Sequence, residues 1–131
     1  MNSPSLKEFQ DQVSELLLRH RSLLDVLSKN NQSNASVHRA VIKSVTECGC
    51  IEIHAKKQRY PEQPDLQEAM ETLEHHLSGH LCDQCSEAVT AELGKNLFYV
   101  SALCNLLDID LQQVVENESK KCSTLGLFNL S

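Results

Sequence analysis

A run of apolar residues in the second half of the chain repeats at the spacing of an α-helix. Its members recur every three or four residues, which places them on one side of a helix with 3.6 residues per turn. They are Val89, Leu93, Leu97, Val100, Leu103 and Cys104. The run predicts a long helix from about Cys82 to Leu107, and its apolar stripe is the strongest in the sequence.

Capping signals predict where another helix begins. The tetrapeptide Ser5-Leu6-Lys7-Glu8 fits a capping box, in which the serine hydroxyl and the glutamate side chain satisfy exposed backbone amides. Apolar residues then continue at helical spacing as far as Leu27. The stretch Lys29–Asn34 is polar and rich in Asn and Ser, so it predicts the loop that ends this first helix.

The rest of the sequence is also helical in pattern. A second helix is expected over Ser36–Gln58, with Gly49 inside it at a cost of about 1 kcal/mol relative to Ala. A short helix is expected over Asp65–Leu77, and a last one from Asp110 to about Cys122. No segment has a convincing strand pattern. The sequence therefore predicts a single all-α domain over residues 1–131, a bundle of four to five helices.

Charge and the N-terminal sequence exclude several kinds of partner. The formal net charge is -6 at pH 7, and the only basic cluster is Lys56, Lys57 and Arg59. Nucleic acid is not an expected partner, because phosphate binding requires a basic face. The first ten residues contain no apolar signal core, and no apolar stretch is long enough to cross a bilayer. We therefore expect a cytoplasmic protein that does not bind membranes.

Two segments of the chain resemble the MazG-like nucleotide pyrophosphohydrolases. The stretch Glu92–Leu103, followed by Asn105–Leu111, is similar to the family's second motif: an acidic pair, an apolar "LFYL" run and a final "LGIDL". The stretch Thr46–Glu52 is similar to the family's earlier acidic helix. The resemblance covers roughly Ser36–Lys121. It implies a helical hairpin in which the faces carrying Glu47 and Glu92 meet, and a homo-oligomer.

The resemblance also implies a metal site and shows where this chain departs from it. In the family, two pairs of carboxylates hold magnesium, which neutralises a nucleoside triphosphate and activates water. Glu47 and Glu92 match two of the four acids, whereas Cys50 and Lys95 stand at the other two positions. A lysine at a ligand position can pair with Glu92 or Glu47 instead. The implied acidic site of Glu47, Glu92 and Lys95 is therefore vestigial, and no residue is assigned as catalytic.

Four of the six cysteines form two close pairs. Cys48-Gly49-Cys50 is a C-x-C, and Cys82-Asp83-Gln84-Cys85 is a C-x-x-C at the start of the predicted long helix. Two such pairs are typical of a zinc site in a reducing compartment. In a straight helix Cys48 and Cys50 would point about 200° apart, so both can bind one ion only if Gly49 loosens the turn.

Other interpretations of these cysteines remain open. Cys48 and Cys50 can be small buried residues while the C-x-x-C is incidental, or the C-x-x-C can be a redox pair. His80 or His54 can replace one thiol as a ligand, whereas Cys104 lies on the apolar stripe and is expected in the core.

Two classes of function follow from these patterns. The first is a zinc-stabilised module that binds a nucleotide or a protein partner without hydrolysing it. The second is an active magnesium-dependent pyrophosphohydrolase with rearranged ligands. The loss of two ligands out of four favours the first class.

Overall fold

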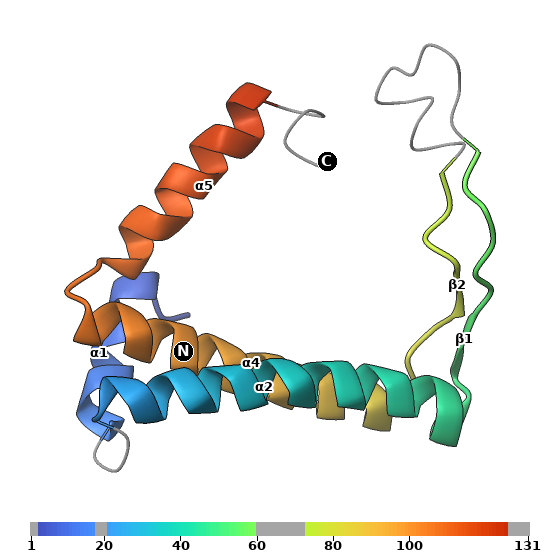
Figure 1. Ribbon diagram of the computed structural model, residues 1–131, viewed down its shortest axis with the longest axis horizontal. Helices are drawn as coiled ribbons and strands as arrows, with labels where there is room; N and C mark the ends of the chain where they lie inside the picture. The colour runs from blue at the N-terminus through green and yellow to red at the C-terminus, as the bar shows by residue number, and fades with distance from the viewer. Residues whose placement is uncertain (1–2, 18–20, 60–72, 126–131) are drawn as a thin grey trace. The chain divides into compact units, whose positions relative to one another are not determined.

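The computed structural model describes residues 3–17, 21–59 and 73–125, and it is mostly helical (Figure 1). The described elements are α1 (Leu6–Leu16), α2 (Leu23–Lys43), a π-helical turn (Ser44–Cys48), β1 (Ile51–Ile53), β2 (Leu77–Gly79), α4 (Asp83–Leu106) and α5 (Leu111–Leu125). None of the helices within the described ranges has the length and hydropathy needed to cross a membrane.

The chain forms two compact units. Unit 1 comprises Met1–His38 with Thr90–Ser131, and unit 2 comprises Arg39–Val89. Helices α2 and α4 each contribute residues to both units. The expectation of one domain over residues 1–131 stays a prediction.

Unit 1 is built around a small apolar cluster. Helices α1, α2 and α4, together with the residue that follows α1, supply its buried residues, which are Val13, Leu17, Val26 and Ala102. Phe9, Phe98 and Leu103 pack against them. The serine half of the predicted capping box is present, because the Ser5 hydroxyl accepts a hydrogen bond from the Glu8 amide at 3.1 Å. The Glu8 carboxylate accepts from the Ser5 hydroxyl at 3.2 Å. Cys104 is buried, as the sequence predicted.

One glutamine ties α1 to the turn between α4 and α5. The Gln10 side chain donates to the Ile109 carbonyl at 2.8 Å and accepts from the Leu111 amide at 2.9 Å. The Asp110 carboxylate caps α5 by accepting from the Gln112 amide at 3.0 Å, and the helix runs three residues past the predicted end at Cys122.

The predicted loop at Lys29–Asn34 is wrong, because α2 runs through it without a break. The first predicted helix is also too long, since α1 ends at Leu16 and α2 begins at Leu23. Tertiary contacts override the low helix propensity of the polar stretch. Ser33 is buried, and Asn34 accepts a hydrogen bond from the side chain of Asn96 on α4 at 2.5 Å.

The predicted second helix over Ser36–Gln58 is also wrong, and the prediction that the chain contains no strands is wrong too. Helix α2 ends at Lys43, and after the π-helical turn the chain enters β1, which pairs antiparallel with β2. The cross-strand partners are Ile51 with Gly79, Glu52 with Ser78, and Ile53 with Leu77. The start of the predicted helix Asp65–Leu77 lies outside the described residues, and its last five residues are not helical.

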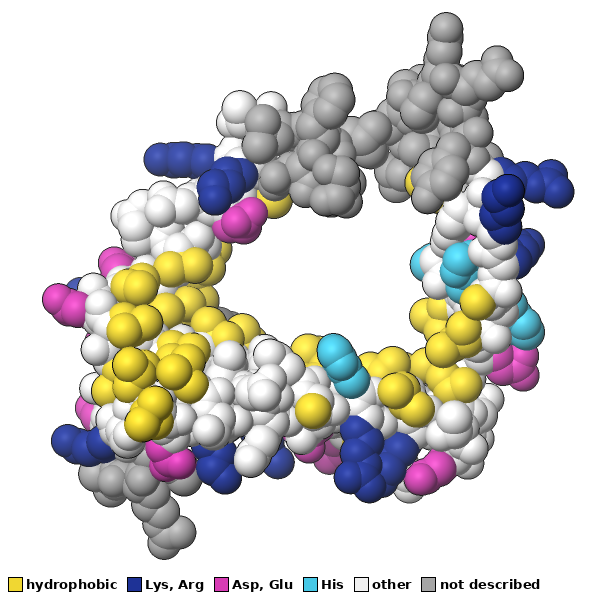
Figure 2. Space-filling view, in the orientation of Figure 1, with side chains coloured by type: hydrophobic (Ala, Val, Ile, Leu, Met, Phe, Trp, Pro, Cys, Tyr) yellow, Lys and Arg dark blue, Asp and Glu magenta, His cyan; other side chains and the backbone are white. Residues whose placement is uncertain are grey.

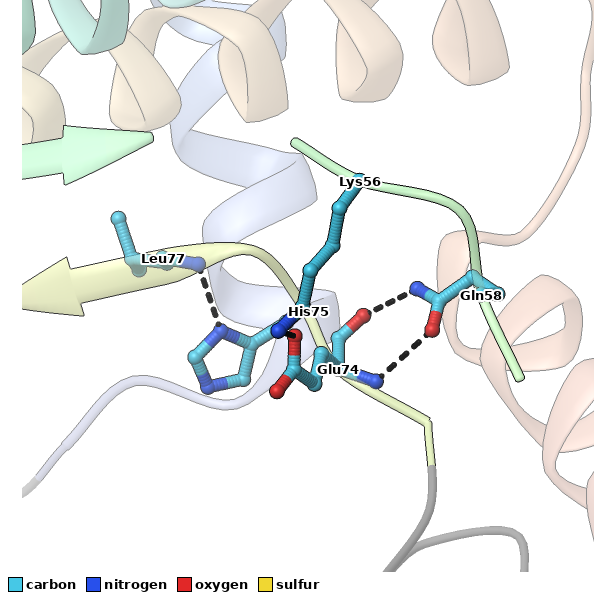
Figure 3. A network of polar contacts seen from close by, with 5 residues as sticks. All are labelled: Lys56, Gln58, Glu74, His75 and Leu77. Atoms are coloured by element: carbon cyan, nitrogen blue, oxygen red, sulfur yellow. Dashed lines mark hydrogen bonds and ion pairs between the residues drawn. The ribbon is translucent and has the colours of Figure 1, made fainter. Parts of the chain in front are cut away.

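Beyond the paired strands, side chains continue to join the two arms of the chain (Figure 3). The Gln58 amide both donates to the Glu74 carbonyl and accepts from the Glu74 amide, so it takes the place of a strand backbone. The Lys56 ammonium lies 3.1 Å from the Glu74 carboxylate, and the Leu77 amide donates to His75 Nδ1 at 3.1 Å. The contacts of Gln58 and Lys56 with Glu74 join the arm that ends before residue 60 to the arm that begins after residue 72, whereas the Leu77–His75 contact lies within the second arm.

Candidate metal centre

The first cysteine pair lies at the end of a helix rather than inside one. The Ser44 hydroxyl donates to the Ala40 carbonyl at 3.0 Å, and the helix then widens into the π-helical turn. Gly49 ends that turn with φ +79°, and its amide donates to the Ser44 carbonyl at 2.9 Å. Because glycine adopts this left-handed conformation without steric cost, the backbone reverses between Cys48 and Cys50. The distortion at Gly49 that the sequence required is therefore present.

A second glycine lets the other cysteine pair approach. Gly79 faces Ile51 across the two strands and has φ +86°. A Cβ atom built at Gly79 would lie 2.5 Å from the Cys50 carbonyl oxygen, closer than such atoms can approach. Only glycine therefore allows the strand that leads to Cys82 to pass this close to Cys50.

The second cysteine pair begins α4, as the sequence predicted. Cys82 immediately precedes the helix, and its sulfur accepts a hydrogen bond from the Cys85 amide at 3.4 Å. The contact resembles an N-cap, in which a side chain accepts from an amide in the first turn. It directs both sulfurs of the C-x-x-C to the same side of the helix start.

The four sulfur atoms converge in a geometry that suits one ion. The Sγ atoms of Cys48, Cys50, Cys82 and Cys85 all lie within 4.8 Å of one another. Cys48 and Cys82 have a sulfur–sulfur distance of 3.8 Å. A regular tetrahedron with Zn–S bonds of about 2.3 Å has sulfur–sulfur edges of about 3.8 Å. The site is therefore close to the size of a single tetrahedral metal ion, and all four thiols are free.

Mutual contacts give the thiols unequal acidity. Hydrogen bonding from the Cys85 amide, reinforced by the Cys85 side chain, lowers the pKa of Cys82 to about 7. Hydrogen bonding with Ser44 lowers the pKa of Cys85, but the neighbouring Cys82 sulfur, burial and the other two thiols outweigh it and raise the value to about 12. One thiolate is thus available at neutral pH to begin binding a cation, while the Cys85 thiol must lose a proton to bind.

Ser44 is a site residue that the sequence analysis missed. Its side chain is only 1% exposed, its carbonyl accepts from the Cys50 thiol at 3.8 Å, and its hydroxyl contacts Cys85. Ser44 lies four residues before Cys48 in the sequence, but only the π-helical turn brings it into contact with Cys50 and Cys85. Gly79 was missed as well, since no signal in the sequence indicates a close backbone approach there.

The alternative ligands do not join the cluster. His54 Nε2 lies 3.1 Å from the Glu52 carboxylate, and His80 is exposed. Within residues 3–17, 21–59 and 73–125, the four cysteines are the only group of three or more metal-ligating side chains close enough to share an ion. Cys48 is exposed and Cys50 is half-buried, so the alternative that these two are small buried residues is wrong.

The acids of the vestigial site are divided between the two units. Glu47 is exposed on the π-helical turn in unit 2, whereas Glu92 and Lys95 belong to α4 in unit 1. The Lys95 ammonium lies 3.7 Å from the Glu92 carboxylate, the pairing that the sequence suggested. The packing of the Glu47 face against the Glu92 face stays a prediction.

No known family model, curated protein or solved structure matches this chain.

Proposed function

We propose that Cys48, Cys50, Cys82 and Cys85 bind one structural zinc ion in a non-catalytic, partner-binding module. The observation that carries the proposal is the convergence of four sulfurs within 4.8 Å from two segments more than 30 residues apart. Thiolates are soft ligands, and four of them in a tetrahedral arrangement favour zinc over magnesium.

A structural role follows from how little else holds unit 2 together. Among its described residues, the large apolar side chains that are buried are Ile51 and Val89. Each contributes about 1.5–3 kcal/mol, and a two-stranded sheet is at best marginally stable alone. A structural zinc site has an apparent binding free energy of about 10 kcal/mol or more at neutral pH. The metal would therefore supply most of the free energy that holds the hairpin to α2 and α4.

A catalytic zinc role is less consistent with this arrangement. Catalytic sites keep one coordination position for water or substrate, whereas four thiolates complete the tetrahedron. Hydrolysis at the vestigial acidic site is also disfavoured, because the Lys95 ammonium already occupies the neighbourhood of the Glu92 carboxylate. A magnesium ion there would have to displace a positive charge.

The partner that we propose is a second copy of the chain. Large apolar side chains of unit 1 remain exposed, namely Leu16, Leu23, Leu24, Leu27, Leu93, Leu97, Leu106, Leu107, Ile109, Val114 and Val115. They outnumber the four buried residues of its core cluster. Figure 2 shows apolar side chains gathered at the surface around the beginning of α5. Exposed apolar patches on a protein surface often mark interaction sites, and self-association is also what the MazG-like resemblance implies.

Metal content and thermal stability test the zinc proposal. Untagged protein purified under reducing conditions without chelator should contain one zinc per chain. A strong chelator should lower the melting temperature, and Cys82→Ser should lower it similarly. Cys122→Ser is the matched control, because Cys122 is an exposed thiol outside the cluster. A zinc content below about 0.1 per chain would refute a site of this affinity.

Sedimentation analysis tests the self-association proposal separately. The wild-type chain should sediment as a dimer or larger species, and Leu24→Glu should shift it toward the monomer. Leu24 is 76% exposed, so the charge adds no burial cost within one chain. A wild-type chain that is monomeric at all concentrations would overturn this part of the proposal.

A further inference from the structure

The four thiols of the centre differ in how easily a reagent from solution can reach them. Cys48 is exposed at the end of the π-helical turn, whereas Cys50, Cys82 and Cys85 are half-buried. Thiol oxidation follows access as well as thiolate character, and zinc binding keeps all four sulfurs deprotonated. An oxidant will therefore meet the Cys48 sulfur first.

The Cys48 sulfur has a partner at short range. Cys82 Sγ lies 3.8 Å away, and a disulfide has a sulfur–sulfur bond of about 2.05 Å. The two atoms must approach by roughly 1.8 Å, which side-chain rotation of an exposed cysteine at a helix end can supply. Cys82 immediately precedes α4 and its sulfur accepts from the Cys85 amide, whereas Cys48 lies at the exposed end of the π-helical turn. The Cys48 side chain is therefore the one that we expect to rotate.

We propose that Cys48 and Cys82 form an oxidation site through which hydrogen peroxide opens the metal centre. The Cys48 sulfur attacks the peroxide, forms an S–O bond and releases water after protonation. The Cys82 sulfur then attacks the resulting sulfenic acid, forms the disulfide and releases the hydroxyl group as a second water. Two thiolates lose two electrons in total, two protons are taken up from solvent, and one hydrogen peroxide is reduced to two waters. The release of zinc in this scheme rests on the zinc centre proposed above.

The geometry also predicts what remains after oxidation. The disulfide removes two of the four ligands, and Cys50 and Cys85 alone cannot complete a tetrahedral zinc site. The new covalent bond nevertheless joins the π-helical turn to the start of α4, the same two segments that the ion joined. Oxidation therefore exchanges a metal crosslink for a disulfide crosslink and leaves Cys50 and Cys85 as reduced thiols without a metal ion.

Disulfide mapping on the full chain tests this proposal. Zinc-loaded Cys122→Ser protein, which lacks the exposed thiol outside the cluster, is treated with hydrogen peroxide. Released zinc is followed with a chromophoric chelator, and disulfides are identified by mass spectrometry of non-reduced peptides. We expect one zinc released per Cys48–Cys82 disulfide and recovery of zinc binding after dithiothreitol. In a Cys48→Ser background, disulfide formation should be at least about tenfold slower.

The outcomes separate the two proposals. A dominant Cys82–Cys85 or Cys48–Cys50 disulfide, zinc release without any disulfide, or an unchanged rate in Cys48→Ser would overturn the oxidation site. If the purified chain binds no zinc, the metal proposal fails, and the same peptide mapping on metal-free protein still decides which cysteines pair. A Cys85→Ser variant should still form the Cys48–Cys82 disulfide, which guards against a variant that simply misfolds.

Discussion

Replacing Gly79 with alanine should disrupt the metal centre without touching a ligand. Gly79 has φ +86°, and a Cβ atom there would lie 2.5 Å from the carbonyl oxygen of Cys50. That carbonyl belongs to the backbone of a proposed ligand residue, so it cannot swing aside as a flexible side chain can. Relief of the contact must move either the C-x-C segment or the strand that leads to Cys82.

Two terms set the size of this effect. A non-glycine residue in the left-handed region costs about 1–2 kcal/mol, and forcing an extra methyl group into a packed site costs about 1–3 kcal/mol. If both costs apply to the metal-bound state, the binding free energy of zinc should weaken by about 2–5 kcal/mol, which lowers the affinity roughly 30- to 4,000-fold. The melting temperature of the zinc-loaded protein should fall as well.

Two other glycines provide matched controls for this prediction. Gly49 has φ +79° but open space around its Cβ position, so Gly49→Ala should show only the conformational term, a loss of roughly 5- to 30-fold. Gly94 lies within α4 with open space around it, so Gly94→Ala should leave zinc affinity unchanged and stabilise the helix by about 1 kcal/mol. Competition with a chromophoric chelator measures all three affinities. Equal losses for Gly79→Ala and Gly49→Ala would refute the argument from the Cys50 carbonyl.

Three further predictions concern protons, a buried hydroxyl and hydrolysis. Zinc affinity should rise with pH, because thiols must lose their protons to bind the ion. Below the Cys82 pKa of about 7, one more proton must be lost, so the affinity should change by about a further tenfold per pH unit. Competition titration measures this slope, and the same slope above and below about pH 7 would contradict the prediction. Ser44→Ala should weaken zinc about tenfold through a lost hydrogen bond, whereas Ser33→Ala, which removes a buried hydroxyl without a partner among the described residues, should not. With magnesium, nucleoside triphosphates should not release pyrophosphate at a significant rate; turnover near about 1 s⁻¹ that disappears in Glu92→Gln would show the opposite.

Local signals in the sequence predicted the parts of the fold that depend on local physics. The Ser5 cap and the apolar stripe of α4 gave the correct start of α1 and nearly the correct bounds of α4. The spacing of the cysteines predicted which four would come together, because a C-x-x-C at a helix start already directs two sulfurs to one side. Those features need no information about distant residues.

The missed features depend on contacts between distant segments. The strands β1 and β2 are three residues each, and Ile51 and Ile53 were too short a β-branched pattern to outweigh the helical run before them. The polar residues after Lys29 favour a loop by propensity, but α2 retains them in a helix that packs against other elements. Gly79 acquires its importance only because its strand passes beside the Cys50 carbonyl.

X-ray absorption at the zinc edge, on protein purified under reducing conditions, tests the central claim most directly. The proposed centre predicts one zinc per chain with a first shell of four sulfur atoms at about 2.3 Å. A shell dominated by nitrogen or oxygen, or fewer than four sulfurs at full occupancy, would contradict a site built by Cys48, Cys50, Cys82 and Cys85.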